Sequence, residues 1–201
     1  MPEETVTERE EKNGSSINQG ATGADPRIQL VREAVRDIAD FPKPGILFRD
    51  IMPAISDAKV FEAIIQLFAE ECQKYNPTRV LGIEARGFIL GASVATRLGV
   101  GFVPVRKPGK LPAAVYRAEY ELEYGHDCVE MHRDALDKSD RVVIVDDLLA
   151  TGGTTAATCK VVEMAQAKIE SIVCLIDLAF LPWREKLAGR TVRTFISYAG
   201  E

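Results

Sequence analysis

The feature that most constrains this 201-residue chain is a regular alternation of short apolar runs with helical segments after Asn76 and Pro77. Strands are predicted at 79–83, 102–105, 142–145 and 171–177, and helices at 87–98 and 153–167. Continuous apolar strands joined by helices are typical of a parallel sheet that is buried on both faces. The chain is therefore predicted to be an α/β protein.

The first 24 residues have a different composition, rich in Glu, Thr, Asn, Gly and Ser. Val6 and Ile17 are the only sizeable apolar side chains in this stretch, too few to offset the entropy cost of ordering it. Residues 1–24 are therefore predicted to be a disordered tail, and residues 25–201 a single domain.

The N-terminal part of this domain is predicted to be helical. Asp25 is a candidate N-cap before Pro26, and apolar residues at helical spacing extend this first helix to about Asp40. A loop is predicted at 41–51, because its two prolines and glycine cannot continue the helix. A second amphipathic helix is predicted at 59–75.

A long excursion at 106–133 interrupts the alternation of strands and helices. It opens with a Pro-Gly loop and continues as YRAEYELEYG, in which polar and apolar residues alternate as in an exposed hairpin. Three acids of this stretch, Glu119, Glu121 and Glu123, would share one face of a strand. Long excursions between core strands are often lids over a site.

Composition excludes several classes of function. The net charge of −5 argues against non-specific nucleic-acid binding, which depends on neutralising phosphates. No segment has the pattern of a signal peptide or of a membrane-spanning helix. The four cysteines form no CxxC pair, and the two histidines suggest no zinc site with them, so free buried thiols in a soluble, cytoplasmic protein are expected.

The run VVIVDDLLATGGTT at 142–155 carries the clearest chemistry. Asp146 and Asp147 follow a buried strand, at the end where open α/β sheets bind ligands. The segment 151–154 then leads into a helix, where glycines let amide N–H groups converge on a phosphate and threonines add hydroxyl donors. Because two carboxylates would repel that phosphate, we expect them to face the vicinal hydroxyls of a ribose.

A turn followed by a helix N-cap is the alternative interpretation of this run, but it leaves both adjacent acids unexplained. A nucleoside-triphosphate P-loop is excluded, because no GxxxxGK[ST] motif occurs.

The run at 142–155 resembles the phosphoribosyl diphosphate (PRPP) signature of type I phosphoribosyltransferases. FPKPGILFRDI at 41–51, IEARGFILGASVA at 83–95, VPVRKPGKLP at 103–112 and YELEYGHDCVEMHRDAL at 120–136 resemble the adenine phosphoribosyltransferase family. The resemblance implies a mostly parallel twisted sheet flanked by helices, with a small hood and a flexible flap loop at about 106–124. It also implies adenine and PRPP as substrates, AMP and pyrophosphate as products, and a homodimer.

The resemblance assigns the site residues as follows. The PRPP loop comprises Asp146, Asp147, Ala150, Thr151, Gly152, Gly153 and Thr154, and the residues that contact adenine are Leu47, Phe48, Arg49 and Leu148. Phe48 would stack on the base, while backbone groups of Leu47 and Arg49 would read its edge. Plain core packing is the alternative for Phe48.

The resemblance also implies a pyrophosphate loop with a cis peptide near Glu84-Ala85, in which Arg86 is both a PRPP-binding and a catalytic residue. A surface arginine on a tight turn is the alternative. Arg106, Lys107 and Lys110 would meet the departing pyrophosphate, the alternative being a solvated charge run. Glu123 and Tyr124 correspond to the flap acid/base and its neighbour, although the raw pattern does not select one acid from three.

No metal cluster with protein ligands is indicated, and Mg²⁺ is expected to be carried by PRPP oxygens. Two rivals remain open at this level. A transferase for another purine would share the same Asp-Asp loop. A non-catalytic PRPP- or purine-sensing regulator would be expected to have an added DNA-binding domain and a degraded flap.

Overall fold

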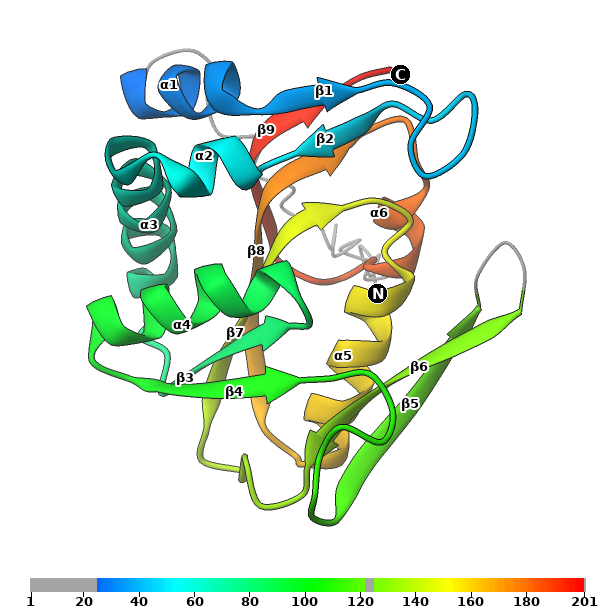
Figure 1. The fold of residues 1–201 in the computed structure, drawn as a ribbon. Helices are drawn as coiled ribbons and strands as arrows, with labels where there is room; N and C mark the ends of the chain where they lie inside the picture. Colours follow the sequence, from blue (N-terminus) through cyan, green and yellow to red (C-terminus); the bar gives the residue numbers. More distant parts are fainter. Residues whose placement is uncertain (1–24, 122–124, 201) are drawn as a thin grey trace, which may run out of the picture.

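The computed structural model describes residues 25–121 and 125–200. Its centre is a five-stranded sheet in which every pairing is parallel, with the strand order β4-β3-β7-β8-β9 (Figure 1). The strands are β3 (Arg79–Ile83), β4 (Gly101–Val105), β7 (Arg141–Leu149), β8 (Lys168–Leu178) and β9 (Val192–Tyr198). The predicted parallel α/β plan is confirmed, and β9 adds a strand that the sequence pattern did not predict.

Alternate residues of the central strands face two separate hydrophobic cores. Val143 and Val145 pack with the helices α3 (Ala58–Gln73) and α4 (Arg86–Leu98) on one face of the sheet. Val142 and Ile144 pack with the helix α5 (Gly153–Met164) on the other face. This burial on both faces explains why the strands are apolar without interruption.

The predicted helix boundaries hold best where a cap is present. The side chain of Asp57 accepts the backbone N–H groups of Lys59 and Val60 at the start of α3. Gly99, with a φ of 68°, ends α4 in the left-handed conformation. Both helices lie within two residues of the ranges predicted from the sequence.

The first helix is shorter than predicted. Helix α1 (Pro26–Ala34) begins as expected, because the Asp25 side chain accepts the backbone N–H of Arg27. It ends at Ala34 rather than near Asp40, because the following residues form strand β1 (Arg36–Ile38). This strand pairs with β2 (Phe48–Asp50), and an Arg36–Asp50 ion pair of 2.5 Å links them, a partner that helical spacing does not reveal.

The segment predicted as a loop at 41–51 is therefore only partly a loop, since it ends in strand β2. The short helix α2 (Met52–Ser56) follows directly, with Pro53 in its first turn. Another short helix, α6 (Trp183–Lys186), precedes β9. Neither helix is long enough to show a periodic pattern in the sequence, and neither was predicted.

The excursion at 106–133 contains the expected hairpin. Strands β5 (Val115–Glu121) and β6 (His126–His132) pair antiparallel, and the hairpin extends away from the main sheet beside α5 (Figure 1). Glu119 and Glu121 are both exposed, as expected for acids on the outer face of the strand. Glu123 and Tyr124 lie outside the described residues, as does the predicted tail 1–24.

Cys72, Cys128, Cys159 and Cys174 are free and buried, as predicted. Among the residues that the structure describes, no helix is long and apolar enough to cross a membrane.

Candidate active site

The carboxyl end of strand β7 forms the floor of the candidate site. Strand β3 pairs with β7 only as far as Val145, whereas β8 continues alongside it to Leu149. The edge of β7 is therefore unpaired by β3 from Asp146 onward, at the position where open α/β sheets bind ligands. The cavity at this edge has a volume of about 190 Å³ and is lined by Ile83, Glu84, Ala85, Arg86, Lys107, Asp146, Asp147, Leu148, Ala150, Thr151, Gly152, Gly153, Thr154 and Thr155.

The predicted phosphate loop at 151–154 depends on two glycines for different reasons. Gly152 has a φ of 76°, and a Cβ there would lie 3.1 Å from Cβ of Trp183. A Cβ on Gly153 would lie 3.1 Å from the ring of Tyr120 in β5. Helix α5 begins at Gly153, and no described residue caps its first N–H groups with a side chain. Because the first residues of α5 line the cavity, these free N–H groups are available to bind an anion there.

The two adjacent carboxylates have different surroundings. Asp147 is buried, and its carboxylate forms an ion pair with Nε of Arg86. Asp146 accepts the backbone N–H of Asp147 at 2.9 Å. Removal from water and the nearby charge of Asp147 raise the pKa of Asp146 well above its ordinary value. Asp147 is thus the carboxylate that pairs with Arg86.

Arg86 joins three parts of the site that the sequence predicts separately. Besides its pair with Asp147, its guanidinium lies 5.8 Å from the ring centroid of Phe48. Burial alone would lower the pKa of Arg86, but the charges of Asp147 and of nearby Asp146 and Asp50 raise it. The peptide bond between Glu84 and Ala85 is cis, which confirms the expectation for this loop. Arg86 is thus ion-paired at the start of α4 and only partly exposed.

The three cations of the 106–110 segment all have carboxylate partners. Arg106 and Lys110 both contact Glu84, and Lys107 pairs with Asp127. Nζ of Lys107 also donates to the hydroxyl of Tyr120 at 2.7 Å. All three are thus ion-paired, although Lys110 is also exposed to solvent. Lys107 lines the cavity directly, whereas Arg106 and Lys110 contact Glu84, which lines it.

Of the residues predicted to contact adenine, the Arg49 side chain lies apart from the others. Phe48 is partly buried and packs edge-on against Phe41, with ring centroids 5.1 Å apart, and Leu47 precedes it. Leu148 lines the cavity. The side chain of Arg49 is buried in a different place, paired with Asp37 at 2.5 Å and 3.9 Å from the ring centroid of Tyr198. Only the backbone of Arg49 is left for reading a base, which is the role expected for it.

Several polar residues of the site were not identified from the sequence. Glu84 could have been found, since it directly follows the buried strand β3. Tyr120 and Asp127 meet only because the hairpin register places them opposite each other, where the Tyr120 hydroxyl donates to Asp127 at 2.9 Å. That contact depends on strand pairing, which the local sequence does not specify.

Comparison with known proteins agrees with this geometry. Residues 54–190 match the model of the phosphoribosyl transferase domain family. The chain is 51% identical over 168 residues to adenine phosphoribosyltransferase of Caldanaerobacter subterraneus subsp. tengcongensis, covering 84% of this chain and 97% of that protein.

Two solved structures are similar over the same region. Adenine phosphoribosyltransferase of Thermoanaerobacter pseudethanolicus has a TM-score of 0.83 and 49% identity, covering 85% of this chain and 99% of that one. The enzyme of Saccharomyces cerevisiae, solved with adenine and an imino-altritol bisphosphate, has a TM-score of 0.82 and 37% identity, covering 85% and 98% of the two chains. With its type I phosphoribosyltransferase fold and its Asp-Asp phosphate loop, this chain belongs to the adenine phosphoribosyltransferase family.

Proposed function

We propose that this protein transfers the 5-phosphoribosyl group of PRPP to adenine and forms AMP and pyrophosphate, a step of purine salvage. The observation that carries the proposal is the convergence of Asp147, Arg86 and the uncapped N-terminus of α5 on one cavity. A phosphate, a ribose and a pyrophosphate group each find a chemically matched partner there. The yeast relative solved with adenine supports the choice of base.

Each part of the cavity has a proposed role in the transfer. The 5-phosphate is bound by the backbone amides of residues 151–154 and by the hydroxyls of Thr151 and Thr154, with Ala150 beside them. Asp146 and Asp147 accept hydrogen bonds from the ribose hydroxyls, and their negative charge stabilises the positive charge that grows at C1. Arg86 leaves its pair with Asp147 in part and, with Lys107, stabilises the departing pyrophosphate.

In this proposal the base lies between strand β2, which carries Phe48, and Leu148 of β7. Phe48 stacks on adenine, and Leu47, Arg49 and Leu148 complete the base site. Glu123, with Tyr124 beside it, takes the purine proton as N9 attacks C1. This last role rests on the resemblance of the flap alone.

Mg²⁺ is the proposed cofactor, and the donor chemistry of the cavity suits it, because Asp146 and Asp147 offer hard oxygen ligands. Among the described residues no group of three or more His, Cys, Asp or Glu side chains could hold a metal by itself. The ion would therefore take most of its ligands from PRPP oxygens and water. When bound, it neutralises charge on the pyrophosphate.

The proposed reaction is tested by incubating the protein with PRPP, Mg²⁺ and one nucleobase at a time, and separating the nucleotides formed. AMP is expected with adenine, and no product with hypoxanthine, guanine or xanthine. Product from one of these bases and none from adenine would assign the chain to another purine, and no product from any base would overturn the transferase role.

We also propose that the protein is a cytoplasmic homodimer. Four free, buried cysteines are consistent with a reducing compartment. Light scattering of the purified protein tests the assembly, and a mass of twice 22.1 kDa is expected.

A further inference from the structure

Glu84 is a partly buried carboxylate for which none of the roles above accounts. It directly follows strand β3, lines the cavity, and its side chain is only 13% exposed. A negative charge in that position opposes the binding of pyrophosphate. Its contacts indicate what it does instead.

The Glu84 carboxylate gathers the cations of the 106–110 segment. One oxygen accepts from Nζ of Lys110 at 2.5 Å, and the other accepts from Nε of Arg106 at 3.2 Å and from the backbone N–H of Lys107 at 3.1 Å. Burial alone would raise the pKa of Glu84, but the hydrogen bonds from Lys110 and Arg106 lower it to about 2. Glu84 is therefore ionised at any pH near neutral.

The backbone of the same segment is fixed independently by Glu130 of β6. Arg106 and Glu130 exchange both backbone hydrogen bonds, at 2.9 and 2.8 Å, and the N–H of Gly109 donates to the Glu130 carboxylate at 2.9 Å. Glu130 thus holds the backbone at Arg106 and Gly109. Glu84 holds the backbone at Lys107 and is the carboxylate that contacts the side chains of both Arg106 and Lys110.

We propose that Glu84 is a positioning residue whose carboxylate keeps Arg106 and Lys110 at the edge of the cavity, ready to meet the diphosphate of PRPP. The inference rests on the proposed function. Long cationic side chains that are already oriented lose less freedom when the diphosphate arrives. Two cations on one carboxylate leave a net positive charge for the ligand.

Replacement by glutamine distinguishes positioning from simple charge. If Glu84 only contributed its charge, Glu84→Gln would make the cavity more positive and bind pyrophosphate more tightly. If it positions the cations, the same change releases them and binding becomes weaker. The two explanations predict opposite signs.

The experiment measures pyrophosphate binding calorimetrically in the presence of Mg²⁺, together with the KM values for PRPP and adenine. Glu84→Gln is expected to raise the Kd for pyrophosphate and the KM for PRPP about ten-fold, the scale of a lost charge-assisted contact, and to change the KM for adenine less than about two-fold. Glu84→Asp, which keeps the charge with a shorter reach, should lie between Glu84→Gln and wild type. Glu62→Gln, a distant exposed carboxylate paired with Arg97, is the matched charge control and should behave as wild type.

A second cycle asks whether Glu84 acts through the two cations. In a chain carrying Arg106→Met and Lys110→Met, Glu84→Gln should change the Kd for pyrophosphate less than about three-fold. Unchanged or tighter binding by Glu84→Gln in the otherwise native chain, or the full ten-fold loss in the double-methionine background, would overturn the proposal. So would a wild-type protein that binds no pyrophosphate.

Failure of the proposed function gives a different result, because the binding measurements need no base. A wild-type protein that forms no AMP but loses pyrophosphate affinity on Glu84→Gln would disprove the transferase role and leave the positioning of the cations intact. If Glu84→Gln strongly lowers the melting temperature, Glu84→Asp is the deciding variant. An affinity of Glu84→Asp for pyrophosphate equal to that of wild type, with Arg106 and Lys110 unchanged, would count against positioning.

Discussion

Asp146 and Asp147 are neighbours in the chain but differ in what surrounds them. Asp147 faces Arg86, while Asp146 lies against the first turn of α4, where Gly87 leaves room for it. A Cβ on Gly87 would lie 2.8 Å from Oδ1 of Asp146 and 3.0 Å from the backbone oxygen of Val145. The glycine is therefore required by the close approach of a helix to a strand.

Gly87→Ala is expected to lower the free energy of unfolding by about 1–3 kcal/mol and to reduce kcat/KM for PRPP, because the strand backbone cannot move away and Asp146 must shift. Chemical denaturation and steady-state kinetics measure the two effects. Gly101→Ala is the matched control, since its Cβ would meet only the flexible side chain of Arg79, at 2.9 Å. Equal behaviour of the two variants would show that the contact at Asp146 is not restrictive.

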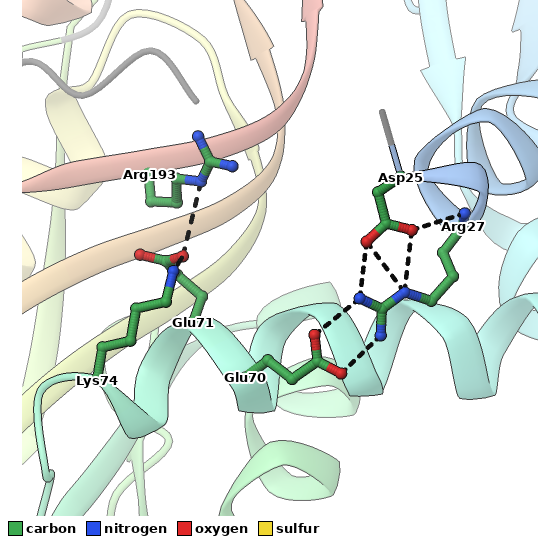
Figure 2. Close-up of polar contacts among 6 residues, drawn as sticks. All are labelled: Asp25, Arg27, Glu70, Glu71, Lys74 and Arg193. Carbon is green, nitrogen blue, oxygen red and sulfur yellow. Dashed lines mark hydrogen bonds and ion pairs between the residues drawn. The ribbon is translucent and has the colours of Figure 1, made fainter. Parts of the chain in front are cut away.

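At the scale of elements, helix α1 is joined to α3 by polar contacts at the protein surface. Figure 2 shows the guanidinium of Arg27 between Asp25 and Glu70, with two bonds of 2.7 Å to the Glu70 carboxylate. The same view shows Glu71 between Lys74 and Arg193 of β9. These contacts supplement the apolar packing of Val31 against the core.

A double-mutant cycle of Arg27→Gln and Glu70→Gln is expected to give a coupling energy of about 0.5–1 kcal/mol near pH 7. The coupling energy is small because the Glu70 side chain is 61% exposed and water screens the ion pair. The Arg27 contact lowers the pKa of Glu70 below 4.5, so this stability is present above that pH and is lost as pH falls through the lowered value.

The same cycle repeated near pH 3 should therefore give a smaller coupling energy. Glu33→Gln serves as the control, because Glu33 lies on α1 with Arg27 but is hydrogen-bonded to Gln29. A coupling energy that does not change between the two pH values would contradict the assignment of this ion pair.

At the scale of the whole molecule, burial also determines the reactivity of the cysteines. Burial raises the pKa of Cys72 to about 12 and that of Cys159 to about 11, and it raises the pKa of Cys128 and Cys174 as well. All four are buried in the folded chain. Thiolate, the reactive form, is therefore rare in the native protein.

Native protein is expected to react with an aromatic disulfide reagent at about pH 8 far more slowly than free cysteine, and all four thiols should react after unfolding in guanidinium. Absorbance of the released thiolate follows both reactions. Rapid labelling of one thiol in the native protein would reveal local opening of the element that carries it.

Local sequence patterns were sufficient to predict four of the five strands of the parallel sheet and the helices α3 and α4. They also placed the predicted phosphate loop after β7. These features depend on the period of apolar residues, on the positions of glycines and on where a parallel strand ends. All three are set by residues that are close together in the sequence. The resemblance of the flap supplied Glu123 and Tyr124, which stay predictions because both lie outside the described residues.

Tertiary structure alone decided which charges meet. The contacts concerned join residues 14 to 61 positions apart in the chain. They are the contact between β1 and β2, that of Glu84 with Arg106 and Lys110, and that of Arg86 with Asp147. Such partners depend on chain packing and strand register, which no local pattern encodes. The sequence by itself therefore determined the parallel sheet and the prediction of a ribose phosphate site at the end of β7. Only the fold decided which carboxylates the cations beside that predicted site contact.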